Sequence, residues 1–413
     1  MDISFKFLSL IPRNLAAVFF LALAGLFFAS PTFANEQPFK QWLLEFKTEA
    51  ATKGISARTL DEALTGVEPI PRVIELDRRQ PEFTLTFRDY VDRMVNDKRI
   101  AKARTTISAN AKLLNQVSKK YGVQPQYLVA FWGLETDFGR LASGYFPVIP
   151  ALATLAHDSR RGEFFRGQLI DALRILDGGH IDLARMKGSW AGAMGHFQFI
   201  PSTFNAYAVD FDGDGKRDIW TNNKDALASA ANFLSNSGWK EDEIWGREVM
   251  VGGDFDFTNA SLKIKKPLSA WQALGVRRIN GNDLPKADVV ASLLAPAGHA
   301  GPKFLVYGNF RAIMRWNQSQ FYALAIGHLA DRITGKGPLS TLGPRDATSL
   351  SFAQSEELQQ LLIDAGYDPG PADGIIGSMT RDAIRAFQKD NQIVPDGHPS
   401  VDILARIKAK KTQ

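Results

Sequence analysis

The chain has 413 residues, enough for two or three domains, since a single core rarely grows beyond about 300 residues. Hydrophobic residues make up 45% of it and charged residues 23%, which excludes a disordered chain, and a net charge of +5 fits an anionic partner without identifying one. Cysteine is absent, which excludes disulfides, thiolate metal sites, a cysteine nucleophile and a lipid-modified amino-terminal cysteine.

Residues 1–34 are typical of a secretory signal peptide. Lys6 and Arg13 form a basic start, an apolar run extends from Leu15 to Ala29, and small residues precede a cleavage site after Ala34. A retained membrane anchor is the alternative, but the apolar core is shorter than the ~20 residues of a spanning helix. The sequence therefore predicts an exported, periplasmic protein with no stable membrane span after cleavage.

Hydrophobic periodicity predicts most of the elements that follow. Helices are expected at residues 38–53, 56–66, 100–121, 126–138, 161–177, 201–209, 224–237 and 318–334. The polar residues 77–83 are predicted to form a loop. Between residues 248 and 306, short β-prone pieces alternate with glycine, asparagine and proline. Strands are expected there at residues 261–264 and 303–307.

Residues 335–349 are rich in glycine, proline, serine and threonine, a composition that marks a domain boundary. Beyond it, short helices are expected at residues 356–365, 380–390 and 401–408. The predicted domains are a signal peptide (1–34), a main domain (35–338), a linker (339–349) and a carboxyl-terminal module (350–410). The predicted fold class is mainly α, with a small β-containing insertion in the helical core and three helices in the module.

Glu135 is the strongest candidate for chemistry. It lies near the carboxyl end of a helix that is apolar on almost every face, where desolvation and the helix dipole both favour the protonated acid. A glutamate that is protonated near neutral pH suits a general acid for glycosidic cleavage. A glutamate that points to solvent or pairs with an arginine fits this helix equally well. Asp137 is a rival acid on another helix face, about 200° away.

Small residues crowd the segment 188–202 and allow a second chain or a ligand to approach the backbone closely. Within it, Ser189 and Gln198 have side chains that can orient sugar hydroxyls or an N-acetyl group. Close helix packing is the more common use of such a stretch. The segment alone leaves both interpretations open.

Three aspartates follow the spacing that begins an EF-hand loop. Asp210, Asp212 and Asp214 occupy its first, third and fifth positions, with glycine at the sixth. Thr221 stands at the twelfth position, where a bidentate glutamate is expected, and Asp225 can close the ring if the loop is longer. A surface turn is the alternative, but the spacing favours a structural Ca²⁺ site. No other metal or cofactor is indicated by the sequence.

Together these motifs carry a family resemblance. Residues 77–83, 132–139, 188–202, 210–218 and 309–317 are similar, in the same order, to motifs of lytic murein transglycosylases of the membrane-bound lytic transglycosylase B type. The resemblance spans about residues 38–335 and implies a lysozyme-like helical core. It also implies cleavage, without water, of the β-1,4 bond from N-acetylmuramic acid to N-acetylglucosamine in peptidoglycan glycan strands. The muramyl C6 hydroxyl would close onto C1 and leave a 1,6-anhydro end.

The resemblance implies roles for the matching residues. Glu135 would be the only catalytic acid and then the base that takes the C6 hydroxyl proton. The sugar cleft would be lined by Ser189, Gln198, Asn317 and Tyr322, and the substrate's carboxylate or peptide would lie near Arg160 and Arg161. The Ca²⁺ ligands would be Asp210, Asp212, Asp214, the backbone of Lys216, and Asp225 as a displaced ligand. Trp316 stands where a tyrosine is common, so a stacking surface is expected without the hydroxyl.

The carboxyl-terminal module resembles the peptidoglycan-binding domain 1 family over residues 358–397, with two Asp-Gly turns and an apolar core of Leu358, Leu361, Leu362, Ile384 and Phe387. Such a module would raise the local concentration of substrate.

Three other functions are weighed against a transglycosylase. A muramidase would admit water at the same bond, and a scaffold would bind wall without cutting it. No nucleic-acid partner is expected, because no basic stripe interleaved with aromatic residues accompanies the charge.

Overall fold

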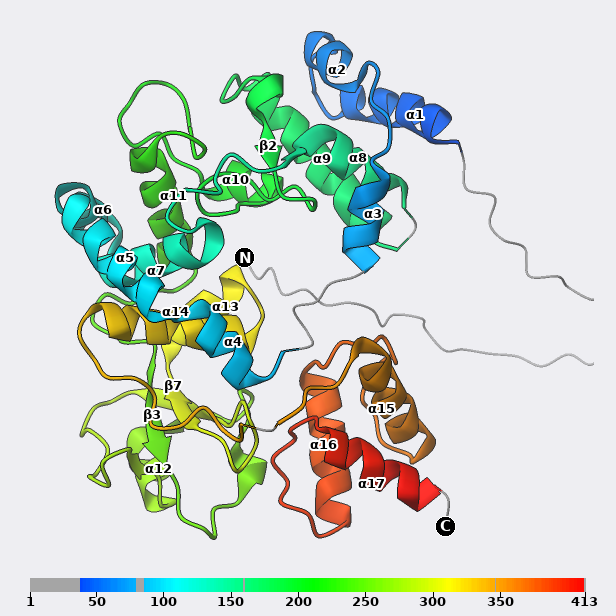
Figure 1. Ribbon diagram of the computed structural model, residues 1–413. Coiled ribbons are helices and arrows are strands. Elements are labelled where there is room, and N and C mark those ends of the chain that lie inside the picture. Colours follow the sequence, from blue (N-terminus) through cyan, green and yellow to red (C-terminus); the bar gives the residue numbers. More distant parts are fainter. Residues whose placement is uncertain (1–37, 79–84, 159, 346, 412–413) are drawn as a thin grey trace, which may run out of the picture. The chain divides into compact units, whose positions relative to one another are not determined.

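The computed structural model describes residues 38–78, 85–158, 160–345 and 347–411 (Figure 1). Residues Phe39–Gln413 form one compact unit. The predicted signal peptide, 1–34, lies outside the described residues. Within the described ranges, every helix is too short or too polar to cross a membrane.

The amino-terminal half of the described chain is helical. Its helices are α1 (Phe39–Thr52), α2 (Ala57–Leu64), α3 (Pro71–Arg78), α4 (Phe87–Met94), α5 (Asp97–Ala109), α6 (Ala111–Tyr121), α7 (Pro125–Thr136), α8 (Val148–His157) and α9 (Gly162–Asp177). The Ser56 side chain caps α2 by accepting a hydrogen bond from the backbone N–H of Thr59, the device expected at a helix start.

Helix α7 lies in the middle of the main hydrophobic core. Eight of its twelve residues are buried, and it packs against α5, α6, α11 and α14. Pro125 occupies its first turn, where a missing N–H costs nothing, and Asp137 ends it in a left-handed conformation with a φ of 51°. A helix apolar all round is expected to be buried in this way. The last turn of α7 therefore carries Glu135 to the edge of the main core.

Further helices complete the core around α7. They are α10 (Pro201–Tyr207), α11 (Asn223–Asn236), α13 (Gly308–Trp316) and α14 (Gln320–Ile333), together with a two-stranded sheet of β1 (Phe146–Pro147) and β2 (Lys187–Gly188). Thus the mainly α fold class predicted from sequence is confirmed.

The predicted β insertion is a five-stranded antiparallel sheet with its own core, which is centred on Trp271 and Leu293. It contains β3 (Gly246–Met250), β4 (Lys266–Pro267), β5 (Arg277–Arg278), β6 (Val290–Leu294) and β7 (Lys303–Val306), in the order β4-β6-β7-β3-β5, with helix α12 (Leu268–Ala273). The strand expected at 303–307 is confirmed as β7. The strand expected at 261–264 is wrong, because the Ser292 hydroxyl bonds the carbonyls of Leu262 and Ile264 in place of a strand ladder.

Two other predictions in the amino-terminal half need correction. The helix expected at 100–121 is two helices, because Asn110 leaves the helical conformation between α5 and α6 and its side chain bonds the carbonyl of Thr106. The loop expected at 77–83 begins inside α3, since Asp77 is buried and held by ion pairs. Residues 79–83 lie outside the described residues.

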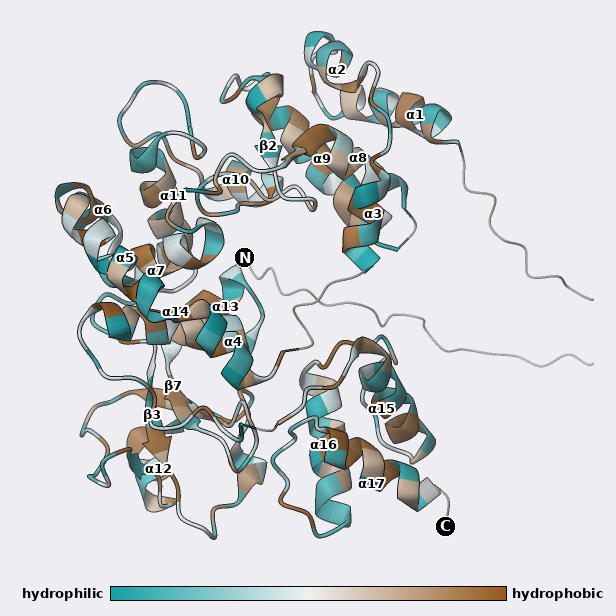
Figure 2. Ribbon diagram, in the orientation of Figure 1, coloured by the Kyte–Doolittle hydropathy of each residue, from teal (hydrophilic) through white to brown (hydrophobic). Residues whose placement is uncertain are grey.

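The carboxyl-terminal module has three helices that enclose a core of their own: α15 (Phe352–Asp364), α16 (Ser378–Asp390) and α17 (Val401–Lys411). Figure 2 shows both hydrophilic and hydrophobic residues along each of these helices. The expected core residues are buried or packed against this core: Leu358, Leu361, Leu362, Ile384 and Phe387. Both Asp-Gly turns have glycine at positive φ, as predicted. A buried glutamine holds each turn, with Gln359 accepting from Gly374 N–H and Gln388 from Gly397 N–H.

His328 gives the main unit a pH-dependent stability. It is 7% exposed in α14, and burial, helped by Arg332, lowers its pKa to about 4. The unfolded chain binds a proton near pH 6.5, so this contribution to stability is complete above pH 6.5 and is lost as the pH falls toward 4. We expect His328→Gln to remove up to about 3 kcal/mol of the acid-induced loss in unfolding free energy. Urea denaturation at several pH values measures it, and equal pH slopes for the variant and the parent protein would contradict it.

Candidate active site

Glu135 is held at one oxygen by two side chains from the junction between α13 and α14. The indole Nε1–H of Trp316 donates to its Oε1 at 3.0 Å, and the hydroxyl of Tyr322 donates to the same atom. Glu135 itself is half-buried at the end of α7. The carboxyl group therefore lies at the edge of the core with one side anchored to protein donors.

The junction that supplies these donors is short and internally braced. Trp316 is the last residue of α13, and Asn317 caps it. The Asn317 side chain accepts from the N–H of Ser319, and the Ser319 hydroxyl accepts from the N–H of Tyr322 at the start of α14. Tyr322 is thus brought to Glu135, whereas the Asn317 side chain acts on the turn itself.

Tyr322 is buried, and burial together with the neighbouring Glu135 raises the pKa of its hydroxyl well above the usual value. The hydroxyl therefore keeps its proton and remains a donor. The ring of Trp316 packs among four aromatic rings, with centroid distances of 4.7 Å to Phe131, 6.2 Å to Phe197, 5.3 Å to Phe199 and 4.9 Å to Phe233. These contacts fix the ring, and its indole N–H is a donor to Glu135.

The rival acid, Asp137, is engaged elsewhere. Its carboxylate forms ion pairs with Arg140 at 2.6 Å and with Lys102 at 3.2 Å. Burial raises its pKa, but the hydrogen bonds from these two cations outweigh burial and lower the pKa below the usual value. Asp137 is consequently an ionised structural partner, which leaves Glu135 as the candidate acid.

The end of α7 is tied to the small-residue segment by a buried histidine that the sequence analysis did not single out. The Trp132 indole N–H donates to Nδ1 of His196 at 2.8 Å, and the Thr136 hydroxyl donates to the His196 carbonyl at 2.7 Å. Burial lowers the pKa of His196, so the ring stays neutral and can accept. A single histidine among glycines and alanines gave no spacing signal for this role.

Ser189 and Gln198 lie in this segment and are half-buried. The Ser189 hydroxyl accepts from the N–H groups of Ala191 and Ala193, and the Gln198 side chain donates to the carbonyl of Gly195. Both side chains therefore shape the loop locally. Gly188 allows a close approach of the backbone within the segment, because a Cβ there would meet the Ala193 carbonyl at 2.3 Å.

Arg160 and Arg161 both bind the buried carboxylate of Asp77. Arg160 Nη1 lies 3.1 Å from Asp77 Oδ2, and Arg161 Nη2 pairs with the other carboxylate oxygen. The two side chains remain 44% and 40% exposed. The pair thus joins α3 to the loop before α9. A guanidinium has five N–H donors, so each arginine retains donors beyond those used on Asp77.

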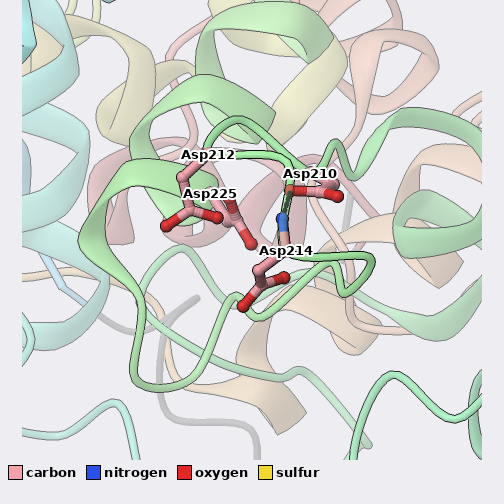
Figure 3. Close-up of side chains that lie close together, drawn as sticks. All are labelled: Asp210, Asp212, Asp214 and Asp225. Atoms are coloured by element: carbon pink, nitrogen blue, oxygen red, sulfur yellow. Dashed lines mark hydrogen bonds between the residues drawn. The ribbon is translucent and has the colours of Figure 1, made fainter.

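The four predicted aspartate ligands converge, as Figure 3 shows. Ligand atoms of Asp210, Asp212, Asp214 and Asp225 all lie within 4.8 Å of one another. Asp225 is fully buried at the start of α11, and burial, with Asp212 and Asp210 nearby, raises its pKa. Lys216 directs its backbone N–H to Asp214. Clustered carboxylate oxygens are what Ca²⁺ prefers, so these residues fit a hard divalent cation.

Two family models match the chain. The model described as the transglycosylase SLT domain matches residues 38–331, and the model of a putative peptidoglycan binding domain matches residues 353–407. The first match covers well over half of the chain and includes every candidate site residue named above.

Individual relatives agree with these matches. Membrane-bound lytic murein transglycosylase B of Escherichia coli K12 is 37% identical over 226 residues, which are 53% of this chain and 60% of that protein. The alignment thus spans less than two thirds of that relative. A crystal structure of SltB3 from Pseudomonas aeruginosa in complex with NAG-anhNAM-pentapeptide has 47% identity and a TM-score of 0.86, covering 90% of this chain and all of that one. The Escherichia coli lytic transglycosylase Slt35 in complex with calcium has 29% identity and a TM-score of 0.62, covering 73% and 94%.

Proposed function

The chain belongs to the transglycosylase SLT domain family, and on that premise we propose that it is a lytic transglycosylase that cleaves peptidoglycan glycan strands without water. The observation that carries this proposal is the carboxyl group of Glu135, which two donors hold at the end of a buried helix. The fold is that of solved lytic transglycosylases, one of them in complex with NAG-anhNAM-pentapeptide.

Glu135 acts first as a general acid. It protonates the oxygen that bridges N-acetylmuramic acid and N-acetylglucosamine, and the bond from that oxygen to C1 of the muramyl residue breaks. The carboxylate then removes the proton of the muramyl C6 hydroxyl, whose oxygen closes onto C1. The product is a 1,6-anhydro end, and Glu135 regains its proton.

A muramidase on the same scaffold is the second candidate. Most glycosidases use a second carboxylate as nucleophile or as base for water. Asp137, the acid closest to Glu135 in sequence, forms ion pairs with Lys102 and Arg140, so it is not available as that second carboxylate. A transglycosylase does not need a second carboxylate, because the C6 hydroxyl of the substrate is the nucleophile.

The product ends decide between these two reactions. Purified sacculi are incubated with residues 35–413 in water enriched in heavy oxygen, and the released muropeptides are analysed by mass spectrometry. A transglycosylase gives ends that are lighter than reducing ends by one water and carry no label. Labelled reducing ends would mean that the protein is a hydrolase.

We propose the same division of the chain into domains that the sequence predicts. Residues 1–34 direct export to the periplasm, 35–338 form the catalytic domain, 339–349 a linker and 350–410 the peptidoglycan-binding domain. The match of a peptidoglycan-binding family model to residues 353–407 supports the last assignment. By holding wall polymer near the catalytic domain, the module would increase the concentration of scissile bonds at Glu135.

We also propose a structural Ca²⁺ ion at Asp210, Asp212, Asp214, Asp225 and the backbone carbonyl of Lys216. Four carboxylates converge there. Among the residues that the structure describes, a single ion pair, from Lys224 to Asp212, offsets their negative charge. A divalent cation would remove most of the mutual repulsion. Because the cluster joins the loop to the buried start of α11, the ion would stabilise the core without entering the chemistry.

Calcium is therefore expected to raise the thermal stability of the protein. At a concentration 100 times its dissociation constant, a ligand that binds only the folded state adds about 2.7 kcal/mol to the unfolding free energy. We expect Asp225→Asn to lose most of the rise in Tm between chelator and Ca²⁺. Asp218→Asn is the matched control: its carboxylate holds the N–H groups of Trp220 and Thr221 outside the cluster, so it should lower Tm and keep the response to Ca²⁺. No rise in Tm for the parent protein would refute the site.

A further inference from the structure

Trp316 and Tyr322 donate to the same oxygen of Glu135, and the Trp316 donor fixes the direction of its own hydrogen bond. The indole N–H of Trp316 lies 3.0 Å from Oε1 and can only donate, because the indole nitrogen has no accepting lone pair in the ring plane. Oε1 is therefore an acceptor toward Trp316 whether Glu135 is neutral or ionised. The Tyr322 hydroxyl, which keeps its proton, donates to Oε1 as well.

A neutral carboxyl group carries one proton, and an oxygen that accepts two hydrogen bonds is its carbonyl oxygen. We propose that Trp316 is a positioning residue that restricts the proton of Glu135 to Oε2, so that one oxygen serves both steps of the reaction. The inference rests on the proposed transglycosylase reaction. It goes further by assigning separate tasks to the two oxygens.

The reaction then runs through Oε2 alone. The Oε2 proton moves to the bridging oxygen, which also receives the electron pair of the breaking bond to C1. The resulting charge on the carboxylate is stabilised at Oε1 by the two donors. Oε2 next accepts the proton of the C6 hydroxyl while the C6 oxygen forms its bond to C1. The carboxyl group returns to its starting protonation without rotating.

The surroundings of Trp316 make this arrangement rigid. The ring is packed between Phe131 and Phe233, with centroids at 4.7 and 4.9 Å, and the residue ends a helix that the Asn317 turn braces. Rotating the neutral carboxyl by half a turn would bring its O–H against the indole N–H, donor against donor. The orientation that leaves Oε2 protonated is thus the favoured one.

Trp316→Phe tests the proposal, because it keeps an aromatic ring and deletes the donor. We expect kcat to fall about 10-fold, in line with a hydrogen bond to a charged group, while KM changes little. We also expect the alkaline fall in activity to move to higher pH, since a donor that favours the carboxylate has been lost. Trp316→Tyr, which returns a donor, should recover most of kcat.

Phe233→Leu is the packing control, since it removes a ring that contacts Trp316 and leaves the donor in place. It should lower Tm without moving the pH profile. The proposal is overturned if Trp316→Phe keeps the parent kcat and pH profile, or if Phe233→Leu shifts that profile as far. Failure of the proposed function is a different result: the parent protein itself would then release no anhydro ends.

Discussion

Glu135→Gln is expected to abolish transglycosylation almost completely, with kcat reduced by about 10³-fold or more. General acid–base catalysis by one side chain contributes about 10²–10⁴-fold, and in the proposed reaction Glu135 performs both the acid and the base step. Glutamine has nearly the same shape, and its amide oxygen can still accept from Trp316 and Tyr322. The fold and the binding of sacculi should therefore persist, so that the loss appears in kcat and not in KM or Tm.

The measurement is the release of anhydromuropeptides from sacculi, with a pull-down of sacculi and a thermal melt on the same preparations. Asp137→Asn is the matched control, since it removes a carboxylate two residues away that is paired with Lys102 and Arg140. It should cost stability and leave kcat within a few-fold of the parent value. A reversal of these two outcomes would make Asp137 the acid and would contradict the assignment of Glu135.

Gly195→Ala is expected to lower the free energy of unfolding by about 3–5 kcal/mol. Gly195 has a φ of 68°, which costs a residue with a side chain about 1 kcal/mol. In addition, its Cβ would meet the carbonyl oxygen of Ile219 at 2.4 Å, and a backbone atom cannot yield as a flexible side chain can. The neighbouring His196 N–H donates to that same carbonyl, so the link between α7 and the segment 188–202 should weaken as well.

Gly54→Ala separates the two contributions. Gly54 also has a positive φ, 87°, but its Cβ would meet no atom within 4 Å. We expect this variant to lose only the conformational part, about 1 kcal/mol. Chemical denaturation of both variants beside the parent protein gives the comparison. Equal losses would show that the backbone around Ile219 adapts and that the crowding at Gly195 carries no cost.

Much of the helical core followed from local patterns. Helix α7 was predictable because Pro125 starts it and apolar residues cover almost every face. The irregular backbone at 261–264, where a strand was expected, was not predictable, since the β-prone residues there meet a serine hydroxyl, Ser292, from elsewhere in the chain. The break at Asn110 was missed for a different reason: a residue that bonds its own helix backbone can end a helix without disturbing the apolar period.

The candidate site likewise contains residues that local sequence predicts and residues that only the packing of the helices reveals. Glu135 and the aspartate cluster were accessible from sequence because a helix end and an Asp spacing are local signals, and the carboxylates do converge. The donors to Glu135 were not, because Trp316 and Tyr322 lie 181 and 187 residues further along the chain. Family resemblance placed Tyr322 in the cleft, but only the packing of α13 and α14 against α7 and α11 shows which atom each donor reaches.

That separation along the chain has a consequence under the proposed export of the protein by residues 1–34. Translocation delivers a polypeptide amino end first, so Glu135 emerges well before the junction of α13 and α14 that anchors it. A partly translocated chain holds the acid without its donors and without the final helix of the core, α14. Under the proposed function the Glu135 carboxyl is thus held by its donors only late, after Tyr322 has crossed, and a stalled or truncated precursor lacking that junction is expected to leave the surrounding wall uncut.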